Sequence, residues 1–121
     1  MTKKTFYRVC NAETQQGLWY DFSGTHTGLI HDEFAFCKNK NLPMPYDPMA
    51  VGWLSATETR EELYEWFPVE DIIRLQKHGY FLYLYESSIY KQHHNHWLIS
   101  QRHSQIIEQK IMRISPEKVL L

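Results

Sequence analysis

The chain has 121 residues, which is the size of one domain and enough to bury an adequate core. Apolar residues make up 43% of it, and 13 Lys and Arg against 14 Asp and Glu leave a net charge of −1. This balance offers no broad basic face, so we expect no nucleic-acid binding driven by charge. The N-terminus lacks an apolar signal segment, and no apolar run approaches the length of a membrane span. Together these features predict a small soluble protein of the cytoplasm.

The first predicted element is a strand over residues 5–10, which is rich in β-forming side chains. Alternation places Phe6, Arg8 and Cys10 on one face of this strand. An arginine between two apolar residues either extends to the solvent at a sheet edge or points into a cavity that holds an anion. The two cysteines, Cys10 and Cys37, lie in apolar runs without a CxxC spacing, which predicts buried free thiols.

The middle of the chain predicts helices between strands. Acidic residues near the start of 30–39 and a lysine near its end favour a short helix, and residues 49–56 read as a strand. Thr59 and Glu62 have the spacing of a capping box at the start of a helix over 59–67. Pro68 ends that helix and begins a second one over 68–78, which Gly79 closes as a left-handed cap.

The later part of the chain predicts more strands. Residues 80–86 are apolar on both faces, which is typical of a central strand, and 96–100 form another after a polar connection over 87–95. Residues 106–114 suit a strand, although their apolar spacing also fits a helix. We therefore expect one α+β domain over residues 1–121: a curved, mostly antiparallel sheet with the helices at 59–67 and 68–78 packed on one side.

The densest group of potential metal ligands is the run that contains His93, His94 and His96. Neighbouring imidazoles can bind a transition metal. Structural zinc sites, however, use four ligands at characteristic spacings, and neither a cysteine nor an HExxH motif supports this run. A solvated histidine-rich turn is the preferred interpretation, with no metal expected.

One set of residues joins distant parts of the chain: Arg8 on the first strand, Ser55 and Thr57 at the end of a middle strand, and Glu86 or Gln101 on later strands. Tyr7-Arg8 and the Ser-x-Thr pattern remotely resemble the Arg and Ser-Thr-Ser motifs of ADP-ribosyltransferase-like folds. The resemblance implies NAD as cofactor, with Arg8 as phosphate anchor, Ser55 and Thr57 lining the nicotinamide pocket, and Glu86 as the catalytic group. The chain departs from the family by lacking a Glu-x-Glu or Gln-x-Glu pair on a late strand. An inactive relative that uses the cleft for binding is therefore included in this alternative.

The preferred functional prediction is a small binding or interaction protein without a cofactor. Its overall character is similar to small proteins of bacteria and their phages, which implies a role linked to phages or mobile elements. Aromatic side chains make up 15% of the chain, and large rings serve interfaces and ligand pockets. We expect an aromatic surface that meets a protein partner or a small ligand, formed by Trp19, Tyr20, Tyr46 and Trp53. The oligomeric state is left open.

Overall fold

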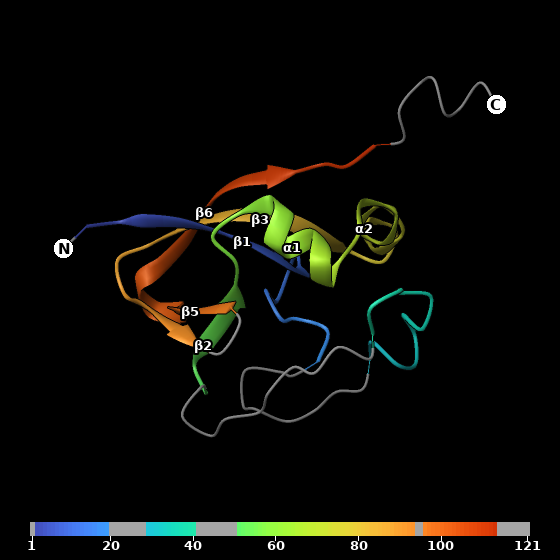
Figure 1. Ribbon diagram of the computed structural model, residues 1–121, viewed down its shortest axis with the longest axis horizontal. Helices are drawn as coiled ribbons and strands as arrows, with labels where there is room; N and C mark the ends of the chain where they lie inside the picture. The colour runs from blue at the N-terminus through green and yellow to red at the C-terminus, as the bar shows by residue number, and fades with distance from the viewer. Residues whose placement is uncertain (1, 20–28, 41–50, 94–95, 114–121) are drawn as a thin grey trace.

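A computed structural model describes residues 2–19, 29–40, 51–93 and 96–113. Strands dominate this part of the chain, and two short consecutive helices interrupt them (Figure 1). The elements in chain order are β1 (Lys4–Asn11), β2 (Trp53–Ala56), α1 (Arg60–Trp66), α2 (Val69–Gln76), β3 (Tyr80–Ser87), β4 (Tyr90–His93), β5 (His96–Ser100) and β6 (Ser104–Lys110). A single turn of 3-10 helix, Gln101–His103, connects β5 to β6. The predicted α+β class is confirmed.

The described strands form two antiparallel sheets of three strands each, in the orders β1-β3-β6 and β2-β5-β4. A pair of backbone hydrogen bonds joins the two sheets: Tyr7 N–H donates to Thr57 O at 2.8 Å, and Thr57 N–H donates to Tyr7 O at 2.9 Å. The free side of β1 is therefore attached to the chain that leaves β2. Figure 1 shows β2 and β5 on one side of β1, while β6 runs along the opposite margin of the molecule.

Alternation along β3 explains why the molecule has two apolar clusters. Tyr80 and Leu82 pack in the cluster that includes the helices, with Leu63 of α1 and Ile72 of α2. The next cluster lies between the two sheets and is formed by Phe6, Cys10, Leu54, Ala56, Tyr83, Tyr85 and Ile99. Both faces of β3 are therefore buried, as the sequence predicts, and β3 is the central strand of its sheet. The helices pack on one side of that sheet, as predicted. The described strands form two sheets, however, where the sequence predicts one, because β1 pairs with β3 and β2 pairs with β5.

Local sequence signals fix the ends of the helices. Glu62 N–H donates to the Thr59 hydroxyl at 3.2 Å, which confirms Thr59 as the N-cap of α1. The Thr59 hydroxyl in turn lies 3.0 Å from Glu62 Oε1, so the carboxylate binds the side chain of the cap. Pro68 is the N-cap of α2, and Gly79 has a φ of +87°, the left-handed conformation that favours glycine before β3 begins.

Two sequence expectations are wrong and one ambiguity is resolved. Residues 30–39 form consecutive turns instead of a helix, because Lys38 N–H donates to the buried carboxylate of Asp71 at 2.7 Å and ties the segment to α2. The polar connection at 87–95 contains strand β4, which pairs with β5. The ambiguous segment at 106–114 is the strand β6, since it pairs with β3. No helix in the described ranges is long and apolar enough to cross a membrane.

Candidate functional site

Arg8 is the most deeply buried cation of the described chain, at 7% exposed. Its guanidinium donates to two backbone carbonyls, from Nη1 to Ser55 O at 2.9 Å and from Nη2 to Gln15 O at 2.8 Å. Arg8 Nε is buried without a hydrogen-bond partner. The ion pairs between described residues do not include Arg8. Arg8 therefore connects β1 to β2 and to the loop after β1, and these bonds use two of its five N–H donors.

A polar chain extends from Arg8 between the two sheets. The Tyr85 hydroxyl donates to Gln15 Oε1 at 2.9 Å and lies 3.3 Å from Cys10 Sγ. Gln15 has a φ of +62°, a left-handed conformation that costs energy in a residue other than glycine. Its carbonyl and its side-chain amide each hold one of these partners, which stabilises the strained backbone. This role of Gln15 was not predicted from the sequence. The signal that could have found it is Arg8 itself, because an arginine on an apolar strand face needs a hydrogen-bond acceptor nearby.

Burial controls the ionisation of the groups along this polar chain. It raises the pKa of the Cys10 thiol, with the charge of Arg8 acting in the opposite direction, and it also raises the pKa of Tyr85. Both groups are therefore neutral near pH 7. A neutral thiol is a poor nucleophile, so Cys10 acts as a packed core residue, as its sequence context predicts.

Three of the four residues of the predicted NAD site lie close together. The Arg8 guanidinium contacts the backbone of Ser55, and the strand of Arg8 pairs with Thr57 through Tyr7. Thr57 is buried, and its hydroxyl donates to Thr59 O at 2.8 Å. Each of these polar groups is thus engaged within the protein.

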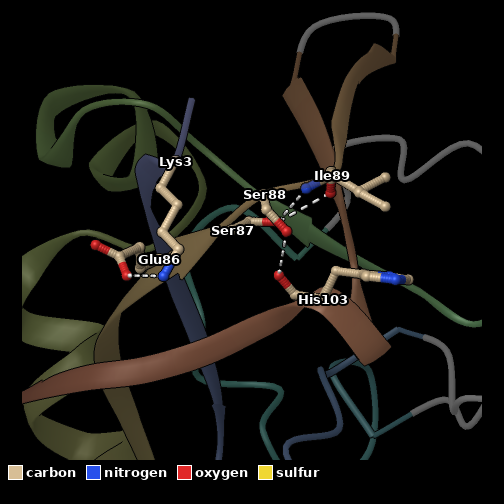
Figure 2. A network of polar contacts seen from close by, with 6 residues as sticks. All are labelled: Lys3, Glu86, Ser87, Ser88, Ile89 and His103. Atoms are coloured by element: carbon tan, nitrogen blue, oxygen red, sulfur yellow. Dashed lines mark hydrogen bonds and ion pairs between the residues drawn. The ribbon is translucent and has the colours of Figure 1, made fainter. Parts of the chain in front are cut away.

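Glu86, the fourth residue, is separated from this group by the sheet. It stands opposite Thr5 in the β1–β3 register, whereas Arg8 stands opposite Tyr83, so alternation turns Glu86 and Arg8 to opposite faces. Figure 2 shows Glu86 beside Lys3, with 3.6 Å between Lys3 Nζ and Glu86 Oε1. The structure therefore does not bring Glu86 to Arg8.

Glu86 lines a polar hollow of about 220 Å³. Its lining carries three basic side chains and one acidic one among small polar residues: Lys3, Glu86, Ser88, Arg102, His103, Ser104 and Gln105. Such a lining could attract a small anion, although Glu86 already offsets one of the cations.

The serines at this corner have structural partners. Figure 2 shows the Ser88 hydroxyl bonded to His103 O and the Ser87 hydroxyl bonded to Ile89 O, at 3.4 and 2.9 Å. The Ser88 N–H also donates to His103 O, at 3.1 Å. Ser104 Oγ lies 2.7 Å from Ser87 Oγ. These bonds hold the turn between β3 and β4 against the start of β6. The serines that line the hollow therefore have a structural role.

The histidine run is only partly described. His93 stands opposite His96 across the β4–β5 hairpin, with 5.5 Å between their ring centroids, and the buried His96 packs edge-on against Trp66. His94 lies outside the described residues. Within the described part of the chain, no group of three or more His, Cys, Asp or Glu is arranged to hold a metal. The predicted solvated turn is wrong for His96, which is buried at the start of β5, and the absence of a metal from the complete run stays a prediction.

The predicted aromatic surface is wrong for Trp19. This ring is 7% exposed and packs against Trp66 and Phe67, with centroid distances of 5.7 and 5.5 Å. The cause is that Leu18 and Trp19 join the helix-side core instead of ending a surface turn. Trp53 is half-buried beneath Lys91 Nζ, which lies 4.5 Å from its ring centroid. Tyr20 and Tyr46 lie outside the described residues.

The exposed large apolar side chains of the described residues are aliphatic, and three of the five lie on or just after β6; the other two are Val51 and Val69. Ile106, Ile107 and Ile111 are 37%, 46% and 46% exposed, and every residue from 105 to 109 is exposed. β6 has β3 as its one neighbour among the described strands. The register with β3 shifts by one residue, so Ile107 is the extra residue of a bulge. The sequence does not reveal this exposure, because apolar spacing predicts burial.

A scan against models of known protein families, a search of curated proteins and a search of solved structures found no match to this chain. The resemblance to ADP-ribosyltransferase-like folds and to small phage proteins therefore stays a prediction.

Proposed function

We propose that this chain is a small interaction protein that binds an extended segment of a partner protein along the outer edge of β6. The exposure of β6 is the observation that carries the proposal. An edge strand presents unpaired N–H and C=O groups that an added strand can satisfy, while exposed side chains near the edge select the partner. Ile106 and Ile107 supply apolar contacts on that strand, and Ile111 continues them beyond it.

The chemistry of β6 also favours a selective partner over indiscriminate pairing. Natural edge strands are interrupted by charges and bulges, which prevent aggregation. β6 carries one charge of each sign, Glu108 and Lys110, and a bulge at Ile107. A partner strand must therefore place its own charges to match, because like charges directly opposite one another destabilise a strand pair.

This proposal replaces the predicted aromatic surface with an aliphatic edge. The aromatic rings of the described chain pack mainly against one another in the two cores, as Trp19 does against Trp66 and Phe6 does against Trp97. Rings used in this way stabilise the fold and leave recognition to β6.

Selection of peptides tests the proposal directly. A library of random extended peptides is selected on the immobilised protein, and the affinity of the selected peptides is compared between the natural chain and Ile107→Lys. We expect Ile107→Lys to weaken binding at least about tenfold, because an added edge lysine opposes strand addition. Val51→Lys is the matched control, since Val51 is 48% exposed and lies just before β2, which belongs to the other sheet. Selected peptides that bind both variants equally would contradict the proposal.

An NAD-using transferase is a second candidate, and one observation favours it. Arg8 Nη1 lies 2.9 Å from Ser55 O, so the two residues are neighbours through the backbone carbonyl of Ser55. The position of Glu86 on the other face of the sheet and the internal bonds of Thr57 weigh against it. We therefore rank it below the interaction protein.

A further inference from the structure

The sequence along and just after β6 is self-complementary about its centre. Residues 106–112 read Ile-Ile-Glu-Gln-Lys-Ile-Met, which is two apolar residues and an acid, then Gln109, then a base and two apolar residues. Two copies of such a segment, laid antiparallel with Gln109 opposite Gln109, match at every position. Resting on the proposed function of β6, we propose that the partner is a second copy of this chain, paired edge to edge on a two-fold axis at Gln109.

The pairs that this register creates are favourable on both faces of the strand. Glu108 stands opposite Lys110 of the second copy, and the two-fold axis repeats this ion pair. Ile107 stands opposite Ile111 of the second copy, which brings together two side chains that are each 46% exposed. The most exposed isoleucines of the described chain thus cover each other.

Neighbouring registers lose these matches. An axis at Glu108 places two carboxylates directly opposite each other, and an axis at Lys110 does the same with two ammonium groups. An axis at Ile107 pairs Glu108 with the apolar Ile106. Of these antiparallel registers, the one centred on Gln109 is therefore the one that pairs opposite charges.

Two hydrogen bonds with α2 hold the backbone at the end of this segment in place. Gln76 of α2 holds the backbone of Met112 by two hydrogen bonds: Met112 N–H donates to Gln76 Oε1 at 2.7 Å, and Gln76 Nε2 donates to Met112 O at 3.0 Å. These bonds fix the chain on the far side of Ile111 from β6. The pairing would merge two sheets in the order β1-β3-β6-β6-β3-β1. A contact of one strand is small, so we expect a dimer that dissociates at micromolar concentrations.

Exchange of charges tests the pairing. Sedimentation equilibrium measures the dimer dissociation constant of the natural chain, of Glu108→Lys, of Lys110→Glu and of the variant with both changes. Each single change turns two attractive pairs into two repulsive ones, so we expect the dissociation constant to rise about tenfold or more. The double variant restores opposite charges across the axis, and its constant should return close to the natural value. Thermal unfolding of each variant at low concentration checks that the fold is intact.

A disulfide tests the register independently. We expect Gln109→Cys to form a dimer with itself on mild oxidation, because the paired Cβ atoms lie within about 5 Å. Ile107→Cys should not do so, since its two copies are offset by four residues, or about 13 Å. A mixture of Ile107→Cys with Ile111→Cys should cross-link again. Cys10 and Cys37 are buried and do not compete.

The outcomes separate this inference from the function on which it rests. A natural chain that stays monomeric, single charge changes without effect, or a double variant that fails to recover would overturn self-pairing. If peptides still bind β6 in that case, the proposed interaction function stands without it. If neither peptides nor a second copy bind β6, both proposals fail.

Discussion

β1 and β6 both pair with the central strand β3, but most residues of β1 are buried or half-buried, whereas most residues of β6 are exposed. β1 lies between the helix-side core and the second sheet, and Thr57 bonds to its free side. β6 also pairs with β3, in a regular register on either side of its bulge, yet most of the residues of β6 are exposed. The comparison teaches that sheet order alone does not decide burial; the layers above and below a strand do. The Arg8 guanidinium of β1 is bound within the fold, whereas β6 leaves apolar side chains exposed.

Removal of the Arg8 donors should give the largest effect. Arg8→Met keeps most of the side-chain volume but leaves the carbonyls of Ser55 and Gln15 without a charged donor. Hydrogen bonds to charged groups contribute about 1.5–3 kcal/mol each, so we expect the free energy of unfolding to fall by about 3 kcal/mol. Urea unfolding measures it, with Arg102→Met, at an exposed position, as a control that changes it by less than about 0.5 kcal/mol. Equal effects of the two substitutions would contradict a structural role for Arg8.

The contrast between the strands can be measured with two matched truncations. Val9→Ala on β1 removes two methyl groups from a site that is 4% exposed, and we expect a loss of about 2 kcal/mol in the free energy of unfolding. Ile107→Ala on β6 removes more atoms but from an exposed site, so we expect less than about 0.5 kcal/mol in the monomer. Denaturant unfolding at low protein concentration compares them. A large cost at Ile107 would show that β6 is covered by another part of the chain.

High pH should lower the free energy of unfolding, because buried groups that are neutral in the folded protein lose protons. Burial raises the pKa of Cys37 to about 12, and burial also raises that of Tyr80. The folded protein holds these protons to a higher pH than the unfolded chain does. The contribution of these two groups to the free energy of unfolding is therefore complete below the ordinary thiol pKa near 9. It is lost as the pH rises toward 12, by up to about 1.4 kcal/mol per pH unit for each group.

Urea unfolding under reducing conditions at several pH values between neutrality and pH 10.5 measures this slope, with pH 10.5 about the upper practical limit. Cys37→Ala is the informative variant. It lowers stability at every pH through the lost packing, but its stability should fall less steeply with pH. An unchanged slope would show that Cys37 is not the group responsible.

The sequence predicted the parts of this fold that depend on local chemistry. The cap at Thr59, the left-handed Gly79 and the two-faced strand β3 each follow from neighbouring residues alone. The burial of Trp19 and the turns at 30–39 could not be predicted, because they depend on contacts with helices far along the chain. The exposure of β6 was missed for the same reason, since its isoleucines look like core residues until the layers are known.

The candidate NAD site illustrates the same division at the level of single residues. The sequence singled out Arg8 as unusual and grouped it with Ser55, whose backbone lies beside the Arg8 guanidinium. It could not show that the contact is made by the backbone carbonyl of Ser55, or that Glu86 turns to the other face.

Addition of NAD should give the smallest effect. We expect millimolar NAD to leave the melting temperature unchanged, because Arg8 is buried and donates to backbone carbonyls, and Glu86 pairs with Lys3 on the other face. A ligand present at one hundred times its dissociation constant would add about 2.7 kcal/mol, which is a shift of several degrees and easily detected. If such a shift occurs, Ser55→Ala and Glu86→Gln decide its origin. A shift reduced by both would place NAD between residues that this fold holds apart, and would require β1 and β3 to rearrange around it.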